Sequence, residues 1–298
     1  MLPCKGCFAT VGVTDESSAA QHHIATQPGA EESGAVMVPG LIASDLDGTL
    51  LGPAGEVSSR TRRALAGITA SGIEVVLVTG RPPRWVRDLP EATGAHAIVV
   101  CANGALLYDV EEHVVIDHAP LASAVAVELI EHLRADARGC SFACEQVFQF
   151  GRDVDYPARQ AAAPDTIVGD VLELVAGAPT TKLIVRDDEV AHDDLVRIVS
   201  EIVGDRAEVT HSGYGIVEIS AAGVDKGRGL RVACERHGIA LADTMAFGDM
   251  PNDLPMLRIA GHAVAVANAH PAVLAVADEV TASNADDGVA LILERLLG

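Results

Sequence analysis

Two aspartates separated by one residue, Asp45 and Asp47, follow a short apolar run in the segment LIASDLDGTLLG, which covers residues 41–52. Paired carboxylates at the end of a buried strand need a chemical reason, because like charges 4 Å apart repel by about 4 kcal/mol at an effective dielectric constant near 20. An ionised aspartate can attack phosphorus, and a second carboxyl group can protonate the departing alcohol and then deprotonate water. Residues i and i+2 of an extended segment project to the same side, so both carboxylates can face one phosphate.

Further polar residues stand where other predicted strands end or where a helix begins: Thr79, Gly80, Arg81, Asn103, Lys226, Asp249, Asn252 and Asp253. Because ligands of open α/β sheets bind outside the carboxyl ends of the strands, we expect these residues to converge on one site. The hydroxyl group of Thr79 and the ammonium group of Lys226 would then hold phosphoryl oxygens as charge develops.

Four aspartates in one site, Asp45, Asp47, Asp249 and Asp253, would repel one another strongly unless protons or cations compensate them. Lys226 supplies a single positive charge. Oxygen atoms are the only ligands that such a site offers, and this donor set favours a hard cation such as Mg²⁺. A bound Mg²⁺ would also allow a phosphate dianion to approach the carboxylates. Gly48 permits a tight turn beside them.

The elements that position these residues alternate between strands and helices. A strand at 41–44 and a helix at 58–72 come first, strands at 73–80 and 96–100 follow, and strands at 244–249 and 262–268 precede a closing helix. The strands are nearly continuous apolar runs, as expected for strands buried on both faces. This order predicts an α/β fold with a doubly wound, mainly parallel, Rossmann-like sheet.

The middle of the chain has a different pattern. A hairpin is expected at 104–118, helices near 121–137 and near 190–203, and alternating strands within 141–151, 180–188, 207–213 and 215–223. The pattern indicates an inserted α+β cap domain over 121–220. The catalytic core would be discontinuous, over 39–120 and 221–298. Residues 1–38 lack periodicity and are predicted to be a flexible tail.

Composition excludes several classes of partner. Lys and Arg total 21 and Asp and Glu total 42, which gives a formal net charge of −21. Nucleic acid and anionic membrane surfaces need basic patches, so we expect neither as a partner. No apolar run approaches the roughly 18 residues of a spanning helix, and no signal peptide is evident. The 6 scattered cysteines indicate reduced thiols and a cytoplasmic protein.

Several other residues invite a functional interpretation but favour a structural one. Cys4 and Cys7 have the spacing of a zinc knuckle, but no second pair lies nearby, and His211, His262 and His270 lack a partner at metal-ligand spacing. Packing roles are expected for Trp85 and Tyr156. Three arginines of the predicted cap would either contact an anionic substrate or remain solvated: Arg152, Arg159 and Arg186.

The motifs resemble those of a known superfamily. DLDGTLL at 45–51, VTGR at 78–81, Lys226 and GDMPND at 248–253 together resemble the haloacid dehalogenase-like superfamily. The segment CANGALLYD at 101–109 and the α/β insert resemble, more narrowly, the Cof-type sugar-phosphate phosphatases. The resemblance covers residues 41–298. Many relatives carry Asn where Met250-Pro251 stands here, while the acidic positions of that motif are intact.

This resemblance implies a role for each matching residue. Asp45 would be the nucleophile and a Mg²⁺ ligand, and Asp47 the general acid/base, ligating Mg²⁺ through its main-chain carbonyl. Asp249 would be the third protein ligand, and Asp253 would support the metal site or orient Lys226. Contacts with the phosphoryl group are implied for Thr79, Gly80, Lys226 and Asn252, while Arg81 and Asn103 would line the site.

The expected function is Mg²⁺-dependent hydrolysis of small phosphorylated metabolites, such as sugar phosphates, through an aspartyl-phosphate. The cap would close over the site and contact the leaving group. A phosphomutase that uses the same Asp45 and Asp47 is an alternative, as is a non-catalytic regulator that binds a phospho-ligand. A haloalkanoic dehalogenase is disfavoured because that reaction does not use Asp47 or Mg²⁺. The sequence does not indicate an oligomeric state.

Overall fold

The computed structural model describes residues 38–89, 93, 98–137, 139–157, 166–211 and 215–298. The predicted tail over 1–38 lies outside the described residues except for Val38, and so do Cys4, Cys7 and Arg159. Among the helices that the structure describes, none combines the length and apolar character needed to cross a membrane. The four cysteines in the described ranges are free thiols.

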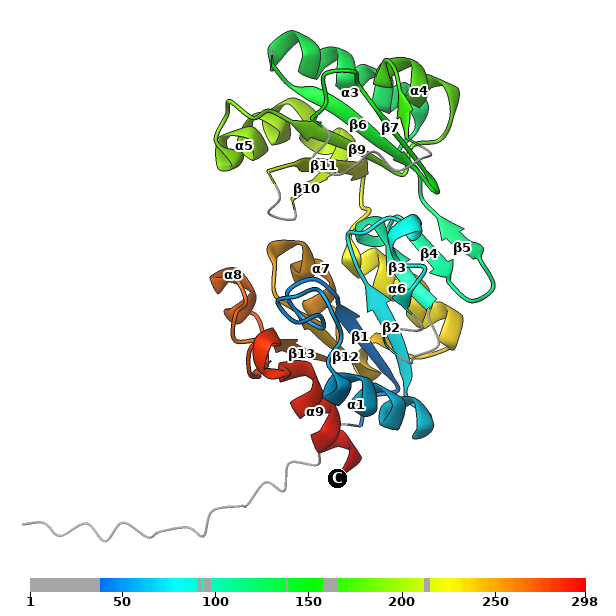
Figure 1. The fold of residues 1–298 in the computed structure, drawn as a ribbon, viewed down its shortest axis with the longest axis vertical. Helices are drawn as coiled ribbons and strands as arrows, with labels where there is room; N and C mark the ends of the chain where they lie inside the picture. The colour runs from blue at the N-terminus through cyan, green and yellow to red at the C-terminus, as the bar shows by residue number, and fades with distance from the viewer. Residues whose placement is uncertain (1–37, 90–92, 94–97, 138, 158–165, 212–214) are drawn as a thin grey trace, which may run out of the picture. The chain divides into compact units, whose positions relative to one another are not determined.

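The first sheet contains eight described strands in the order β14-β13-β12-β1-β2-β3-β4-β5 (Figure 1). Its strands are β1 (Leu41–Asp45), β2 (Glu74–Val78), β3 (Ile98–Cys101), β4 (Leu106–Asp109), β5 (Val114–His118), β12 (Thr244–Gly248), β13 (His262–Ala265) and β14 (Glu279–Val280). Neighbours from β14 to β3 pair in parallel, and β3, β4 and β5 pair antiparallel. The carboxyl ends of β1, β2, β3 and β12 therefore share one edge of the sheet.

Helices cover both faces of this sheet. They are α1 (Ser59–Ala70), α6 (Lys226–His237), α7 (Leu254–Leu257), α8 (Pro271–Leu274) and α9 (Gly288–Leu297). Helices α1 and α9 lie side by side, and α6 packs on β2, β3 and α7 (Figure 1). All five residues of β1 are buried, and so are all residues of β2 except Glu74. Burial of consecutive residues requires cover on both faces, which explains the continuous apolar runs.

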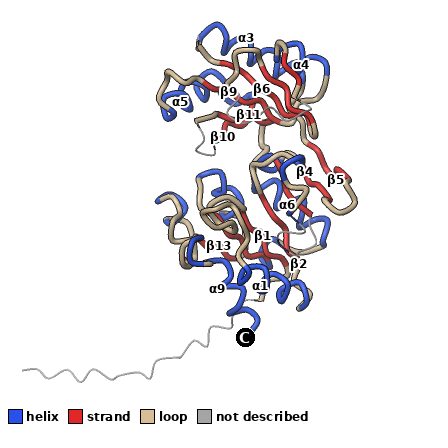
Figure 2. Tube along the Cα trace, in the orientation of Figure 1, coloured by secondary structure: helices blue, strands red, loops and turns tan. Residues whose placement is uncertain are grey.

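The second sheet contains six described strands in the order β10-β11-β9-β6-β7-β8, mostly antiparallel. Its strands are β6 (Ser141–Gln146), β7 (Gln149–Arg152), β8 (Ile167–Val168), β9 (Lys182–Arg186), β10 (Ala207–Thr210) and β11 (Val217–Ala221), and its helices are α3 (Ser123–Asp136), α4 (Val171–Gly177) and α5 (His192–Val203). Figure 2 shows the three helices on one side of the strands. Apolar residues of these helices form a second core with one face of the sheet.

The predicted fold class is confirmed, because a mainly parallel sheet is interrupted between β5 and β12 by a mostly antiparallel one. The hairpin at 104–118 is present as β4 and β5 and extends the first sheet. The domain boundaries at 120 and 220 stay predictions. Helices α4, α7 and α8 and strand β14 were not predicted, because each has only two to seven residues and is too short for a periodic pattern.

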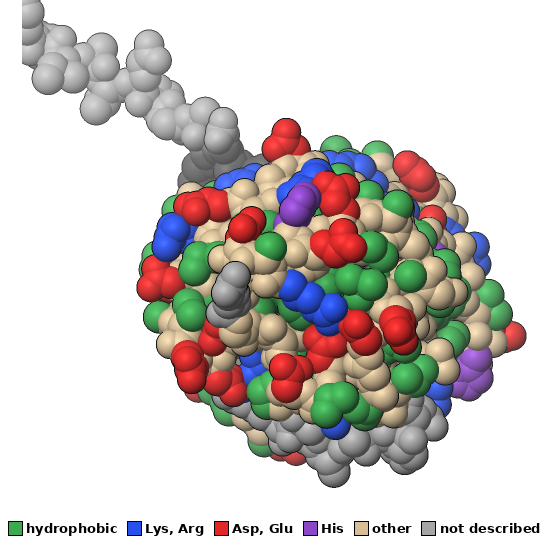
Figure 3. All heavy atoms as spheres, turned by 90° about the horizontal axis from the view of Figure 1, so that it is seen from above, with side chains coloured by type: hydrophobic (Ala, Val, Ile, Leu, Met, Phe, Trp, Pro, Cys, Tyr) green, Lys and Arg blue, Asp and Glu red, His purple; other side chains and the backbone are tan. Residues whose placement is uncertain are grey.

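The surface seen in Figure 3 has no broad basic area among the described residues, as the acidic composition predicts. Acidic, basic and hydrophobic side chains are interspersed on the face that is seen from above. Several exposed arginines are paired with acids, among them Arg60 with Glu294 and Arg295 with Glu279. Pairing of this kind leaves little concentrated positive charge for a polyanion.

An unusual backbone stretch joins β3 to β4. Ala102, Asn103 and Gly104 all have positive φ angles, of 50°, 54° and 97°. A side chain on Gly104 would overlap the main-chain carbonyl of Asp225 and would lie 3.2 Å from the nitrogen of Gly229. The turn therefore fits against the start of α6 only with glycine at position 104. Strain of this kind persists where the surrounding structure fixes the backbone.

Replacing Gly104 by alanine should lower the free energy of unfolding by about 1–3 kcal/mol or more, because the new methyl group meets main-chain atoms and φ is unfavourable. Urea denaturation monitored by circular dichroism would measure the change. Gly177→Ala is the matched control, since Gly177 ends α4 and a methyl group added there would meet no atom within 4 Å. We expect a neutral or slightly stabilising effect there, and equal losses for the two variants would contradict this account of Gly104.

Candidate active site

Asp45 is the last residue of β1 and lies at the carboxyl edge of the first sheet, between β2 and β12. The chain turns immediately after it, with the N–H of Leu50 donating to the carbonyl of Asp45. Gly48 has a φ of 87°, and a side chain there would overlap the carboxylate of Asp249. The hydroxyl group of Thr49 donates to Oδ1 of Asp249 at 3.1 Å. The turn therefore brings the loops after β1 and β12 into contact.

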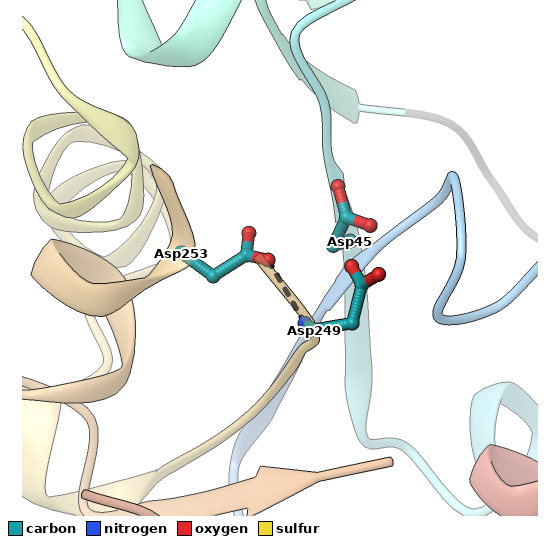
Figure 4. A group of neighbouring side chains, drawn as sticks. All are labelled: Asp45, Asp249 and Asp253. Carbon is teal, nitrogen blue, oxygen red and sulfur yellow. Dashed lines mark hydrogen bonds between the residues drawn. The ribbon is translucent and has the colours of Figure 1, made fainter. Parts of the chain in front are cut away.

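Three aspartates form a buried group at this edge: Asp45, Asp249 and Asp253 (Figure 4). Each offers a carboxylate oxygen, and the three oxygens lie within 4.8 Å of one another. Asp45 is 4% exposed, Asp249 7% and Asp253 0%. The structure thus brings together three of the four aspartates that the sequence singled out, although Asp45 and Asp249 are about two hundred residues apart in the chain.

Lys226 bridges two of these three aspartates. As the first residue of α6 it is 1% exposed, and its Nζ donates to Oδ1 of Asp45 at 2.6 Å and to Oδ1 of Asp253 at 2.5 Å. Burial alone would lower the pKa of Lys226, but the carboxylates of Asp253 and Asp45 outweigh it and raise that pKa. Lys226 is therefore an ammonium ion at neutral pH.

Asp253 is held by protein groups on both of its oxygens. Its Oδ2 accepts the main-chain N–H groups of Asp249 and Met250, each at 3.0 Å, and the first of these bonds is drawn in Figure 4. Oδ1 accepts from Lys226. Asp253 therefore fixes the loop that carries Asp249 and orients Lys226 at the same time.

The group fits a divalent cation. Oδ2 of Asp45 is buried and has no hydrogen-bond partner among the described residues. Burial, opposed by Lys226, raises the pKa of Asp45 well above its ordinary value, and burial together with Asp253 raises the pKa of Asp249 to about 6. Both shifts show that one ammonium ion does not compensate three buried carboxylates. All the donors are oxygens, the ligands that a hard cation prefers.

Asp47 lies outside the buried group. Its carboxylate is bound by Arg81 through two hydrogen bonds, from Nε to Oδ2 at 2.8 Å and from an Nη atom to Oδ1 at 2.5 Å. Both side chains are partly exposed. The bidentate pair fixes the plane of the Asp47 carboxylate. The predicted contact of its main-chain carbonyl with a metal stays a prediction.

The remaining predicted residues lie on the loops after β2, β3 and β12 and are linked to one another. The N–H of Asn103 donates to the carbonyl of Thr79 at 3.0 Å, and Nδ2 of Asn252 donates to Oδ1 of Asn103 at 3.1 Å. Thr79 is fully buried, and its hydroxyl oxygen accepts the N–H of Arg81. A side chain on Gly80 would lie 3.1 Å from Asn103. Thr79, Gly80, Asn103 and Asn252 therefore form one contiguous polar wall.

The arginines of the second sheet have partners of their own. Arg186 is buried and pairs with Asp188, and Arg152 donates to the carbonyls of Asp153 and Tyr156. Trp85 is half exposed, and the Arg84 guanidinium lies 4.6 Å from its ring centroid. The sequence interpretation had singled out neither Arg84 nor the buried charges Glu145, Lys182 and Glu218. Their signal was a charged residue within an otherwise mainly apolar strand, at both ends of KLIVR and at the second residue of VEIS.

The fold is a mainly parallel α/β sheet with an inserted second sheet, and aspartates from β1 and from the loop after β12 meet at one edge. These features define a class of α/β proteins with an inserted cap and an acidic site at the carboxyl edge of the sheet. Residues 42–293 match the family of haloacid dehalogenase-like hydrolases, and the chain belongs to this family. The family prediction is therefore confirmed.

Several of the relatives are named as phosphatases. The chain is 29% identical over 266 residues to the pyridoxal phosphate phosphatase YbhA of Escherichia coli, with 85% of this chain and 97% of that protein covered. It is 28% identical over 250 residues to the 5-amino-6-(5-phospho-D-ribitylamino)uracil phosphatase YcsE of Bacillus subtilis, with 84% and 92% covered. These names agree with the predicted enzyme class, a phosphatase that hydrolyses phosphoric monoesters.

The solved structures agree on the fold. A crystal structure from Thermotoga maritima, of the protein TM0651, superposes with a TM-score of 0.73 at 31% sequence identity. The match covers 86% of this chain and 96% of that one. The inserted second sheet that the resemblance implied is thus shared with a solved relative.

Adding Mg²⁺ to the metal-free protein should raise its melting temperature by several degrees, because binding to the folded state at about 100 times the Kd stabilises it by about 2.7 kcal/mol. Differential scanning fluorimetry at several Mg²⁺ concentrations would measure the shift. The Asp249→Asn variant should lose most of this shift in melting temperature. The Asp205→Asn variant, changed at an exposed position just before β10, should retain the shift. A full shift in the Asp249 variant would contradict the proposed ligand.

In the metal-free protein, Asp249 should contribute a loss of stability as pH rises from about 4 to about 6. Asp249 releases its proton near pH 3.8 when unfolded but at about 6 when folded, so the folded state binds more protons within this window. Urea unfolding in EDTA at a series of pH values would show the slope. Asp249→Asn should flatten it, and an unchanged slope would count against the raised pKa.

Proposed function

We propose that the protein is a Mg²⁺-dependent phosphatase that hydrolyses small phosphorylated metabolites through an aspartyl-phosphate on Asp45. The observation that carries this proposal is the buried group of Asp45, Asp249 and Asp253, two of which Lys226 contacts, at the carboxyl edge of the first sheet within the family match. Its polar wall of Thr79, Gly80, Asn103 and Asn252 supports a bound phosphoryl group beside it.

Asp45 is the proposed nucleophile. Lys226 holds its Oδ1, and the buried Oδ2 has no competing hydrogen bond in the described structure. Attack forms a bond from Asp45 to phosphorus and breaks the bond from phosphorus to the ester oxygen. Asp45 and Asp249 would hold the Mg²⁺, which supplies charge neutralisation between carboxylates and phosphate when bound. Lys226 and Thr79 would hold phosphoryl oxygens as charge develops.

Asp47 is the proposed general acid and base. It donates a proton to the departing ester oxygen and later takes a proton from the water that hydrolyses the aspartyl-phosphate. The bidentate pair with Arg81 supports this role, because it holds the Asp47 carboxylate in one orientation. Hydrolysis returns Asp45 to its carboxylate form and releases inorganic phosphate.

The proposed substrate class is what remains common among relatives that are named for different substrates. One is named for pyridoxal phosphate and another for a phosphorylated ribitylaminouracil, so the shared feature is a phosphomonoester on a small organic group. The residues around Asp45 act on the phosphoryl group alone. Sugar phosphates are the members of this class that we favour, and the residues that would select them lie in the second sheet.

Replacing Asp45 by asparagine should abolish hydrolysis of p-nitrophenyl phosphate, with a loss of at least about 10³-fold in kcat, because the amide is not a nucleophile. Phosphate release would be measured with Mg²⁺ present, and circular dichroism would verify the fold. Substantial remaining activity would refute the nucleophile.

The same assay separates hydrolysis from the alternatives. EDTA should silence the wild-type enzyme and Mg²⁺ should restore it. In ¹⁸O-labelled water one labelled oxygen should enter the released phosphate, since water attacks the aspartyl-phosphate. A phosphomutase would return the phosphoryl group to the substrate without this label, and a non-catalytic regulator would release no phosphate.

A further inference from the structure

The turn that follows β1 carries Asp47 and is weakly held by its own backbone. The hydrogen bonds from the N–H groups of Thr49 and Leu50 are 3.4 and 3.3 Å long, whereas the bond from Leu51 to the carbonyl of Leu46 is 2.8 Å. Backbone bonds of this type are usually about 2.9–3.0 Å long, so the first two are weak. The position of Asp47 therefore depends on contacts from outside the turn.

Two asparagine side chains bind main-chain carbonyls of this turn. Nδ2 of Asn268 donates to the carbonyl of Gly48, and Nδ2 of Asn284 donates to the carbonyl of Leu51, both at 2.8 Å. The N–H of Asn284 donates to Oδ1 of Asn268 at 2.9 Å, so the two residues form one connected asparagine pair. Gly48 directly follows Asp47, and Leu51 forms an isolated bridge with it. The asparagine pair therefore holds the main chain beside Asp47.

The strand order explains why Asn268 reaches this turn. Asn268 lies on the loop that follows β13, and parallel pairing of β13, β12 and β1 brings that loop to the carboxyl edge of the first sheet. Two residues further on, the N–H of His270 donates to the carbonyl of Asp249 at 2.8 Å. The loop after β13 therefore binds the turn that carries Asp47 and the loop that carries Asp249 at the same time.

These bonds add little to the stability of the fold. Asn268 is exposed, and so are both of its hydrogen bonds. A hydrogen bond that water can replace contributes little net free energy, so stability alone gives little reason for this arrangement. The placement of Asp47 gives a better reason. Arg81 holds the carboxylate of Asp47, and the asparagine pair holds the main chain next to it, so the two contacts together fix where the carboxyl group lies.

We propose that Asn268, supported by Asn284, is a positioning residue for Asp47: it holds the turn after β1 so that the carboxyl group of Asp47 meets the departing ester oxygen. This inference rests on the proposed function, in which Asp47 donates a proton to that oxygen as its bond to phosphorus breaks. Proton donation needs a distance of about 2.6–3.2 Å between the heavy atoms, so a small displacement of the turn impairs it. The asparagines act through the turn and not on the substrate.

The first test uses two esters of similar shape that differ in their need for an acid. Phenyl phosphate has the poorer leaving group and depends on protonation, whereas the nitro group of p-nitrophenyl phosphate makes its leaving group good without it. On the full-length enzyme with Mg²⁺, Asn268→Ala should lower kcat/KM for phenyl phosphate by about 10- to 100-fold, a part of what a general acid contributes, and that for p-nitrophenyl phosphate by about threefold or less. Asn284→Ala should show the same selectivity to a smaller extent. Equal losses on the two esters would overturn the proposal.

A double variant assigns the effect to Asp47. If Asn268 acts through Asp47, then Asp47→Asn/Asn268→Ala should match Asp47→Asn alone within about twofold in kcat/KM for phenyl phosphate, whereas additive losses would overturn the assignment. Ser71→Ala is the matched control. It also removes a hydrogen bond from a side chain to a main-chain carbonyl, that of Ile68, but at the end of α1 before β2 begins. It should change kcat/KM for neither ester.

Hydrogen–deuterium exchange keeps this inference separate from the proposed function. Peptides that cover residues 46–52 should exchange about two- to tenfold faster in Asn268→Ala than in the wild-type protein, while Ser71→Ala should leave their exchange unchanged. Faster exchange supports the hold of Asn268 on the turn even if the wild-type enzyme hydrolyses no ester, an outcome that would defeat the phosphatase proposal alone. Unchanged exchange in Asn268→Ala would overturn the inference whatever the activity.

Discussion

The contact of Lys226 with two buried carboxylates is the interaction on which the site depends. Asp45, Asp249 and Asp253 could not share a desolvated space without a positive charge, and the ammonium group reaches two of them at hydrogen-bonding distance. The remaining negative charge makes the group receptive to a cation and, through it, to a phosphate dianion. The same charge arrangement therefore limits the stability of the metal-free protein and is the basis of the proposed catalysis.

Parallel pairing supplies the geometry for this interaction. Because β12, β1, β2 and β3 run in one direction, the loops that follow them meet at one edge, and residues from distant parts of the chain become neighbours. Asp253 ties the β12 loop to α6, Asn103 ties the β3 loop to the β12 loop, and Thr49 ties the β1 turn to Asp249. Each tie is a hydrogen bond that involves a side chain, and the sequence had singled out Asp253 and Asn103 but not Thr49.

The sequence predicted the first sheet and the site better than the second sheet. Continuous apolar runs and the DLDGT and GDMPND motifs placed Asp45 and Asp249 correctly at strand ends, because strand direction follows from the order of elements. Arg81 was expected to line the site, but its bidentate contact with Asp47 depends on side-chain conformation, which a pattern does not contain. Glu145, Lys182 and Glu218 were not recognised, because alternation indicates a polar face without indicating what covers it.

The position of the inserted segment has a consequence for biosynthesis. β1 is flanked by β2 on one side and β12 on the other, and β12 follows only after the whole second sheet has been made. On the ribosome, β1 therefore waits with an unpaired edge for about two hundred residues, a delay that exposes backbone donors and acceptors to intermolecular pairing. The second sheet, whose strands are contiguous in sequence, is able to pair before that edge is closed. The second sheet is thus able to form before β12 completes the first sheet and brings Asp249 and Asp253 to Asp45.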